Sequence, residues 1–135
     1  MAAGYSGTPL AKKLGIKEGF RVVTLSEPPE LGELLGKLPV GVTIGHRLGG
    51  KPDVVLAFQT TKNSLRKRLV RIPDTIHPDR SVWFAWPKKT SGVSTDLTGD
   101  VVRAAILETV LVDVKVCAIS ETWSGLKAVW RKNLR

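Results

Sequence analysis

The chain has 135 residues and a formal net charge of +9, from 21 lysines and arginines against 12 aspartates and glutamates. This length suffices for one domain that buries about two-thirds of its unfolded surface, and it is too short for two ordinary domains. No apolar run approaches the ~20 residues that a membrane-spanning helix needs, so we expect no membrane span. The first residues lack the basic start and apolar stretch of a signal peptide, which favours a cytoplasmic protein.

The positive charge favours an acidic partner but does not identify it. A basic pI is also common among proteins whose charge only prevents association. Cys117 is the single cysteine and lies in an apolar run, which is typical of an inert, buried thiol. His46 and His77 lie far apart in the sequence with no Cys or His at ligand spacing, so we predict no metal site. No serine, cysteine or lysine lies in a recognisable nucleophile motif, so no catalytic residue is predicted.

The first third of the chain contains signals for a helix, a strand and a second helix. Residues 8–15 are predicted to form a short helix, with Thr8 as N-cap, Pro9 at its first position and Gly15 at its left-handed end. A strand follows at 20–25 and ends at two prolines, and 30–38 has the leucine spacing of a weak helix.

The middle of the chain alternates strands with an amphipathic helix. A short strand is expected at 42–45, and a second strand, apolar almost throughout, is expected at 53–58. Residues 61–72 predict a helix with an apolar stripe, which Ile76 continues, and a basic back. The run Val82–Trp86 is apolar and rich in aromatic and branched residues, which predicts a central strand that Pro87 ends.

The last third predicts one helix and a terminal hairpin. Thr98 can cap a helix from Gly99 to about Leu111. Two alternating runs, 112–120 and 126–131, are separated by a five-residue link that places Trp123 and Ser124 at the tip.

These elements predict a single α/β domain over residues 1–135, with an N-terminal arm and short helix at 1–15 and a terminal hairpin at 112–131. The sheet is expected to be mostly parallel, and the antiparallel hairpin is expected on one edge. The parallel strands should be 22–25, 42–44, 54–58 and 82–86.

A lysine-bearing loop follows the central strand, at the edge where an α/β sheet keeps its ligand site. Its cations and hydroxyls suit a phosphate or carboxylate, although a solvated loop explains them equally well. If the hairpin tip reaches the same edge, the predicted site for a small anionic ligand consists of Lys88, Lys89, Thr90, Ser91, Asp96, Trp123 and Lys127.

Nucleic acid is a partner of a different class that the basic faces allow. A basic cluster could follow a phosphate backbone, although a solvated helix face explains it equally well. It consists of Lys62, Arg66, Lys67, Arg68 and Arg71 with Arg131, Lys132 and Arg135 at the C-terminus. The residues predicted to bind nucleic acid are Arg66, Lys67, Arg71, Arg131 and Lys132.

Several segments carry a resemblance to known families. The segments 4–10, 86–97 and 121–127 resemble an uncharacterised family of short bacterial proteins classed as a domain of unknown function. From Leu14 onward, the segments 14–19, 52–55 and 76–80 and the element order resemble the class I methyltransferase fold, which is Rossmann-like. The resemblance implies a reduced methyltransferase-like sheet.

The chain departs from the pattern of those enzymes at two places. The family follows its first strand with a glycine-rich turn at the cofactor and ends its second strand with an acid for the ribose. Here these places hold residues 26–29, with two prolines that supply no amide donors, and residues 45–47. We therefore predict a non-catalytic ligand-binding or regulatory module without a cofactor. An S-adenosylmethionine-dependent methyltransferase, an enzyme of another kind and a nucleic-acid-binding protein remain as alternatives.

Overall fold

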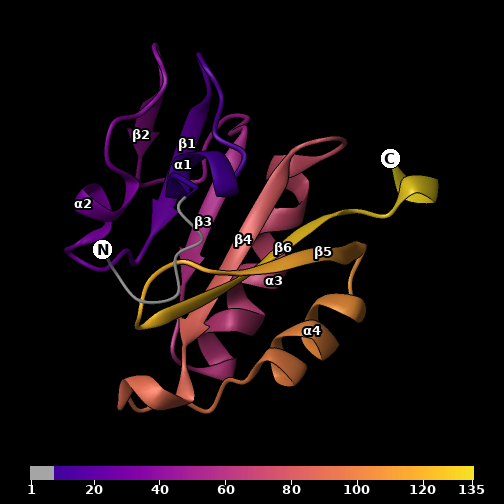
Figure 1. Cartoon of the computed structure of the whole chain (residues 1–135). Helices are drawn as coiled ribbons and strands as arrows, with labels where there is room; N and C mark the ends of the chain where they lie inside the picture. Colours follow the sequence, from indigo (N-terminus) through magenta and orange to yellow (C-terminus); the bar gives the residue numbers. More distant parts are fainter. Residues whose placement is uncertain (1–7) are drawn as a thin grey trace.

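The structure, a computed structural model, describes residues 8–135 and contains a six-stranded sheet with helices on both faces (Figure 1). Across the sheet the order is β2-β1-β3-β4-β6-β5. The first four strands are parallel, β6 is antiparallel to β4, and β5 is antiparallel to β6. This confirms the predicted fold class, including the hairpin on one edge. In chain order the strands are β1 Arg21–Leu25, β2 Thr43–Gly45, β3 Val54–Phe58, β4 Ser81–Pro87, β5 Leu111–Ala118 and β6 Trp123–Trp130.

Strands β3 and β4 occupy the centre of the sheet. Every residue of β3 is buried, and so is every residue of β4 after Ser81. Side chains of β4 alternate between two apolar clusters, so that Phe84 packs on one face and Trp83 on the other. The indole Nε1 of Trp83 donates a hydrogen bond to the Leu14 carbonyl oxygen at 3.0 Å, which satisfies its polar group in the core. The prediction of a central strand at Val82–Trp86 is confirmed.

The helices cover the two faces in pairs. Helices α1 Leu10–Lys13 and α2 Leu31–Leu35 pack on the Trp83 face, and α3 Lys62–Ile76 and α4 Gly99–Leu107 pack on the Phe84 face. The side chain of Thr98 accepts a hydrogen bond from the Val101 amide at 3.2 Å, which confirms the predicted cap of α4. Two short 3-10 turns, η1 Lys89–Ser91 and η2 Lys132–Leu134, follow β4 and β6.

Helix α3 continues through Pro73 to Ile76, the residue that continues the predicted apolar stripe, because both of these apolar residues are buried. The predicted end of the next helix is wrong. Helix α4 stops at Leu107 instead of about Leu111. The Thr109 hydroxyl ends it, since Oγ1 donates to the Ile106 carbonyl oxygen and accepts from the Leu111 amide, which starts β5.

Two further local predictions are also wrong. Trp123 and Ser124 belong to β6 and not to the hairpin tip, because the Ser120 hydroxyl accepts hydrogen bonds from the Thr122 and Trp123 amides and closes the turn at 119–122. At the other end of the chain, Pro9 is the N-cap of α1 and not its first helical residue. The predicted arm at residues 1–7 lies outside the described residues.

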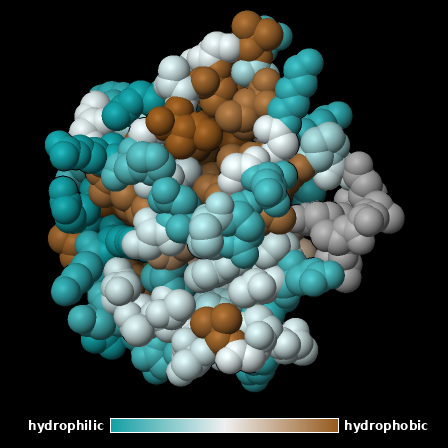
Figure 2. Space-filling model, turned by 90° about the vertical axis from the view of Figure 1, so that its left-hand side faces the viewer, coloured by the Kyte–Doolittle hydropathy of each residue, from teal (hydrophilic) through white to brown (hydrophobic). Residues whose placement is uncertain are grey.

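The sheet ends at β2 on one side. Figure 2 shows the side of the molecule that carries α2 and β2, where apolar atoms gather in the upper part and hydrophilic atoms surround them. Ile44 of β2 is 40% exposed, as expected for a residue of an edge strand. No helix among residues 8–135 has the length and apolar character needed to cross a membrane.

The packing of β6 on β4 generates a stability prediction. A Cβ added at Gly125 would lie 2.8 Å from Ile119 Cδ1 and 3.2 Å from Trp83 Cε3, and both neighbours are buried. We expect Gly125→Ala to lower the free energy of unfolding by about 1–3 kcal/mol, because the core cannot make room for the methyl group. Urea denaturation followed by tryptophan fluorescence measures this change. The matched control is Gly32→Ala in α2, where a Cβ meets no atom within 4 Å and stability should hold or rise; equal effects of the two changes would contradict the packing argument.

Candidate functional site

The predicted loop and the hairpin tip do meet at the carboxyl end of the sheet. Pro87 pairs with Trp123 in the β4–β6 ladder, and the Lys88 amide donates a hydrogen bond to the Thr122 carbonyl oxygen at 2.8 Å. The loop residues Lys88, Lys89, Thr90 and Ser91 therefore lie beside Trp123 at one edge. Lys88 is half-buried, whereas Lys89 is exposed.

Two predicted members of this site have other surroundings. The Trp123 ring packs edge-on against Phe58, with centroids 5.1 Å apart, so it covers its own sheet. Lys127 pairs with Trp83, four residues before Pro87 in β4, which places it about 13 Å along the strand from the loop. Burial lowers the pKa of Lys127, and the charges of Lys115 and Lys17 lower it further.

The polar side chains of the loop bond to the loop and to the segment that begins α3. Asp96 Oδ1 accepts a hydrogen bond from the Lys62 amide at 2.8 Å, at the first turn of α3. The Thr95 hydroxyl donates to the Thr60 carbonyl oxygen at 2.6 Å, and the Ser91 hydroxyl donates to the Lys88 carbonyl oxygen at 2.7 Å. Asp96 thus caps α3 across the gap between two loops, while the cations of Lys88 and Lys89 remain at the edge.

A second cluster of polar side chains lies at the same edge, at the point between β1 and β3 where the strand order reverses. The chain leaves β1 toward β2 on one side and leaves β3 toward β4 on the other, so a crevice opens between the ends of β1 and β3. The guanidinium of Arg68, from α3, fills this crevice. Its Nη2 donates to Ser26 Oγ at 2.6 Å, and its Nη1 donates to Gln59 Oε1 at 3.0 Å and to the Phe58 carbonyl oxygen.

The charge of Arg68 has no acidic partner among residues 8–135. All three of its acceptors are neutral, and burial lowers the pKa of its guanidinium. Gln59 is buried and donates its amide hydrogens to the Ala57 and Ala85 carbonyl oxygens, so its side-chain oxygen is turned toward Arg68. Ser26 has φ +54°, which is uncommon outside glycine and places its hydroxyl at Arg68.

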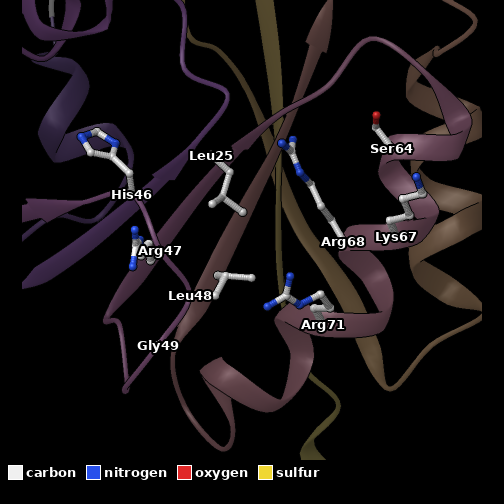
Figure 3. A pocket seen from close by; sticks show the side chains of 9 residues that line it. All are labelled: Leu25, His46, Arg47, Leu48, Gly49, Ser64, Lys67, Arg68 and Arg71. Atoms are coloured by element: carbon white, nitrogen blue, oxygen red, sulfur yellow. The ribbon is translucent and has the colours of Figure 1, made fainter.

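Arg68 forms one wall of a hollow of about 540 Å³ between α3 and the segment after β2 (Figure 3). Arg68 and Arg71 project from α3 toward this segment, which contributes Arg47 and Leu48. No aspartate or glutamate lines the hollow among the described residues. We call it the cationic hollow, and it is lined by Leu25, His46, Arg47, Leu48, Gly49, Ser64, Lys67, Arg68 and Arg71.

His46 stands at the rim of this hollow, at the end of β2. Its Nδ1 lies 2.9 Å from Thr24 Oγ1 and 3.2 Å from Glu27 Oε2, so the ring is held on the α2 side of β1. Within the part of the chain that the structure describes, no group of three or more His, Cys, Asp and Glu side chains is placed to hold a metal ion.

The basic residues proposed for nucleic acid are divided by the fold. Lys67 and Arg71 line the cationic hollow, whereas Arg66 points toward α4 beside Val101 and Glu108. The remaining two, Arg131 and Lys132, follow β6 at the amino end of the parallel strands, where the Arg131 amide bonds the Val110 carbonyl oxygen.

Arg47 was not predicted as a site residue, and Arg68 was named only as part of the basic cluster that could follow a phosphate backbone. Arg68 lies three residues after Leu65 and four residues before Ile72, so it borders the apolar stripe of α3. A charged residue at the border of the apolar stripe, on a helix that follows a buried strand, was the sequence signal that could have indicated this site. The crevice itself depends on strand order, which spacing along the chain does not reveal.

Comparison with solved structures places this architecture among methyltransferase folds. A SAM-dependent methyltransferase from Aquifex aeolicus superposes with a TM-score of 0.61 at 14% identity, over 88% of this chain and 86% of that one. The DhpI–SAH complex gives 0.61 at 10% identity, over 92% and 83%. Magnesium protoporphyrin IX methyltransferase (ChlM) from Synechocystis PCC 6803 with bound SAH gives 0.55 at 10%, over 90% and 78%. Identities this low show a shared fold, and the sequence matches no family model and no curated protein.

The Asp96 contact generates a prediction about the loop. We expect Asp96→Ala to lower the free energy of unfolding by about 1 kcal/mol, because the Lys62 amide loses its acceptor, while Asp96→Asn keeps an acceptor and most of the stability. Thermal unfolding of the three proteins measures both changes. A neutral Asp96→Ala would instead leave this carboxylate available to a ligand.

Cys117 generates a pH prediction. Burial raises the pKa of its thiol, and the nearby charges of Lys13 and Lys115 lower it to a smaller extent. At about pH 8 the folded chain should hold less thiolate than the unfolded chain, so iodoacetamide should react more slowly in buffer than in urea. The free energy of unfolding should also fall as pH rises past the thiol's ordinary pKa, since ionisation favours the unfolded state. Equal alkylation rates in buffer and urea would argue against this burial.

Proposed function

We propose that the protein is a binding module for a small anionic ligand, held at the carboxyl edge of the sheet in the cationic hollow. The observation that carries this proposal is the half-buried guanidinium of Arg68, whose partners are all neutral. Arg47, Lys67 and Arg71 add three further cations to the same hollow. An anion that enters would relieve the mutual repulsion of these charges and gain charge-assisted hydrogen bonds.

The ligand class follows from the kind of cation. Guanidinium groups match the planar or tetrahedral oxygens of carboxylates and phosphates with paired N–H donors, and three of the four cations are arginines. The lysines of the β4 loop lie at the same edge, beyond β3, and would add to the attraction without contacting a small ligand. We take phosphate groups as the principal class, because their higher charge gains most from four cations.

Methyl transfer is the second candidate, and the shared fold favours it. Two features of this chain argue against it. The turn after β1 holds Ser26, Glu27 and two prolines, so it lacks the glycines with which the backbone approaches the cofactor in those enzymes. S-adenosylmethionine also carries a sulfonium cation, which four uncompensated cations would repel.

Calorimetric titration of the whole chain tests the proposal. Pyrophosphate should bind and S-adenosylmethionine should not. Arg68→Met should weaken pyrophosphate by about tenfold to a hundredfold, because a hydrogen-bonded charge in a partly dry site is removed. Arg71 is exposed, so Arg71→Met should cost about fivefold to tenfold.

Arg66→Met is the matched control, since it removes the same charge from the same helix but from the side that faces α4. It should leave the affinity within about twofold. Equal losses for Arg66→Met and Arg71→Met would reduce the binding to general attraction by a basic protein. Low-micromolar binding of S-adenosylmethionine would contradict the proposal and support methyl transfer.

A further inference from the structure

A second hollow adjoins the cationic hollow at the same edge of the sheet. It has a volume of about 290 Å³ and lies on the α2 side of β1 and β2. His46 lines both hollows, so the two spaces adjoin at this residue. Because Thr24 and Leu25 are consecutive residues of β1, their side chains point to opposite faces, and each lines a different hollow. The two spaces therefore lie on opposite faces of the sheet at the end of β1.

The second hollow differs from the first in chemistry. Its lining is mainly apolar, and we call it the apolar hollow. Pro28, Leu31, Leu35 and Ile44 line it together with Thr24, Glu27 and His46. Leu31 and Leu35 are each only 4% exposed, so they form the buried base of the hollow. Ile44 is 40% exposed, so the hollow is open to solvent on that side. Such a space suits an uncharged ring, and its lining holds no lysine or arginine to bind a phosphate.

Polar groups gather at the junction of the two hollows. The Glu27 carboxylate holds His46 Nδ1 through Oε2, and the structure assigns no partner to its other oxygen within residues 8–135. His46 Nε2 is likewise without a partner in this part of the chain. A carboxylate oxygen accepts hydrogen bonds and cannot donate them, so the group that passes this point should carry hydroxyl donors.

We propose, resting on the proposed function, that the ligand is a nucleoside phosphate that straddles the end of β1. Its phosphates lie in the cationic hollow, its sugar hydroxyls donate to Glu27 beside His46, and its base enters the apolar hollow. This arrangement places each part of the ligand against the one surface of matching chemistry. An inorganic anion would use the first hollow alone and leave the second without an occupant.

Titration of the whole chain with ADP, UDP, pyrophosphate and adenosine at one ionic strength tests this proposal. At least one nucleotide should bind about tenfold or more tightly than pyrophosphate, because the base adds apolar contact that pyrophosphate lacks. For whichever nucleotide binds best, the 2′,3′-dideoxy analogue should bind about fivefold more weakly, because it lacks the hydroxyl donors. Adenosine alone should bind weakly, and Arg71→Met should weaken nucleotide and pyrophosphate by the same factor.

A variant that fills only the apolar hollow separates the two parts. Gly32 lines this hollow, and a Cβ there meets no atom within 4 Å, so Gly32→Met can place its side chain in the space without a clash. Gly32→Met should bring nucleotide affinity to within about twofold of pyrophosphate affinity while pyrophosphate binding is unchanged. Glu33→Met is the control on the same helix, since Glu33 does not line the hollow and should leave the ratio of the two affinities intact.

The possible failures can be told apart. If pyrophosphate binds and both nucleotides bind no more tightly, the nucleoside phosphate proposal is overturned and anion binding stands. If neither pyrophosphate nor nucleotide binds, the proposed function fails and this inference fails with it. Equal affinity of the nucleotide and its dideoxy analogue, or nucleotide binding that Gly32→Met does not change, would also overturn the arrangement described here.

Discussion

Strands β3 and β4 are buried on both faces, and this burial decides where the polar groups of the sheet can lie. A strand covered on both sides offers no solvent-exposed face, so its chemistry is confined to its ends. The four parallel strands share one direction, and their carboxyl ends therefore meet at one edge. Gln59, Arg68, His46 and the lysines of the β4 loop all reach that edge, although they come from separate parts of the chain.

A guanidinium cation lies in the crevice between the ends of β1 and β3. Arg68 joins the ends of both strands through Ser26, Gln59 and the Phe58 carbonyl oxygen. These neutral partners take three of its five N–H donors and do not cancel its charge. The three hydrogen bonds fix the position of the guanidinium, and its positive charge stays without an acidic partner among residues 8–135.

The fold is shared with methyltransferases. A fold supplies the position of a site, and the side chains at that position supply its chemistry. Here the end of β1 carries a serine in a left-handed conformation followed by Glu27 and two prolines, and the end of β2 carries His46. At this edge, the lining on one side of β1 is rich in cations, and the lining on the other side is mainly apolar.

The strands, their burial and the fold class could be predicted from the sequence, because these depend on local composition. The apolar run at Val82–Trp86, the Thr98 cap and the paired runs before and after 119–122 all carry their signals within a few residues. Local signals were weaker at element ends. Pro73 continues α3 because its ring is buried, and Thr109 stops α4 through two hydrogen bonds, and neither effect follows from propensity.

Which charged residues share a site depends on the tertiary structure. Lys127 was expected beside Lys88, but the β4–β6 register sets it opposite Trp83. Asp96 was expected among the ligand contacts and instead bonds the Lys62 amide at the start of α3. Arg47 and Arg68, which are distant in the sequence, line one hollow because β1 lies between β2 and β3 in the sheet. Strand order is fixed by the packing of the whole core, so no spacing along the chain could have shown that these two arginines share a site.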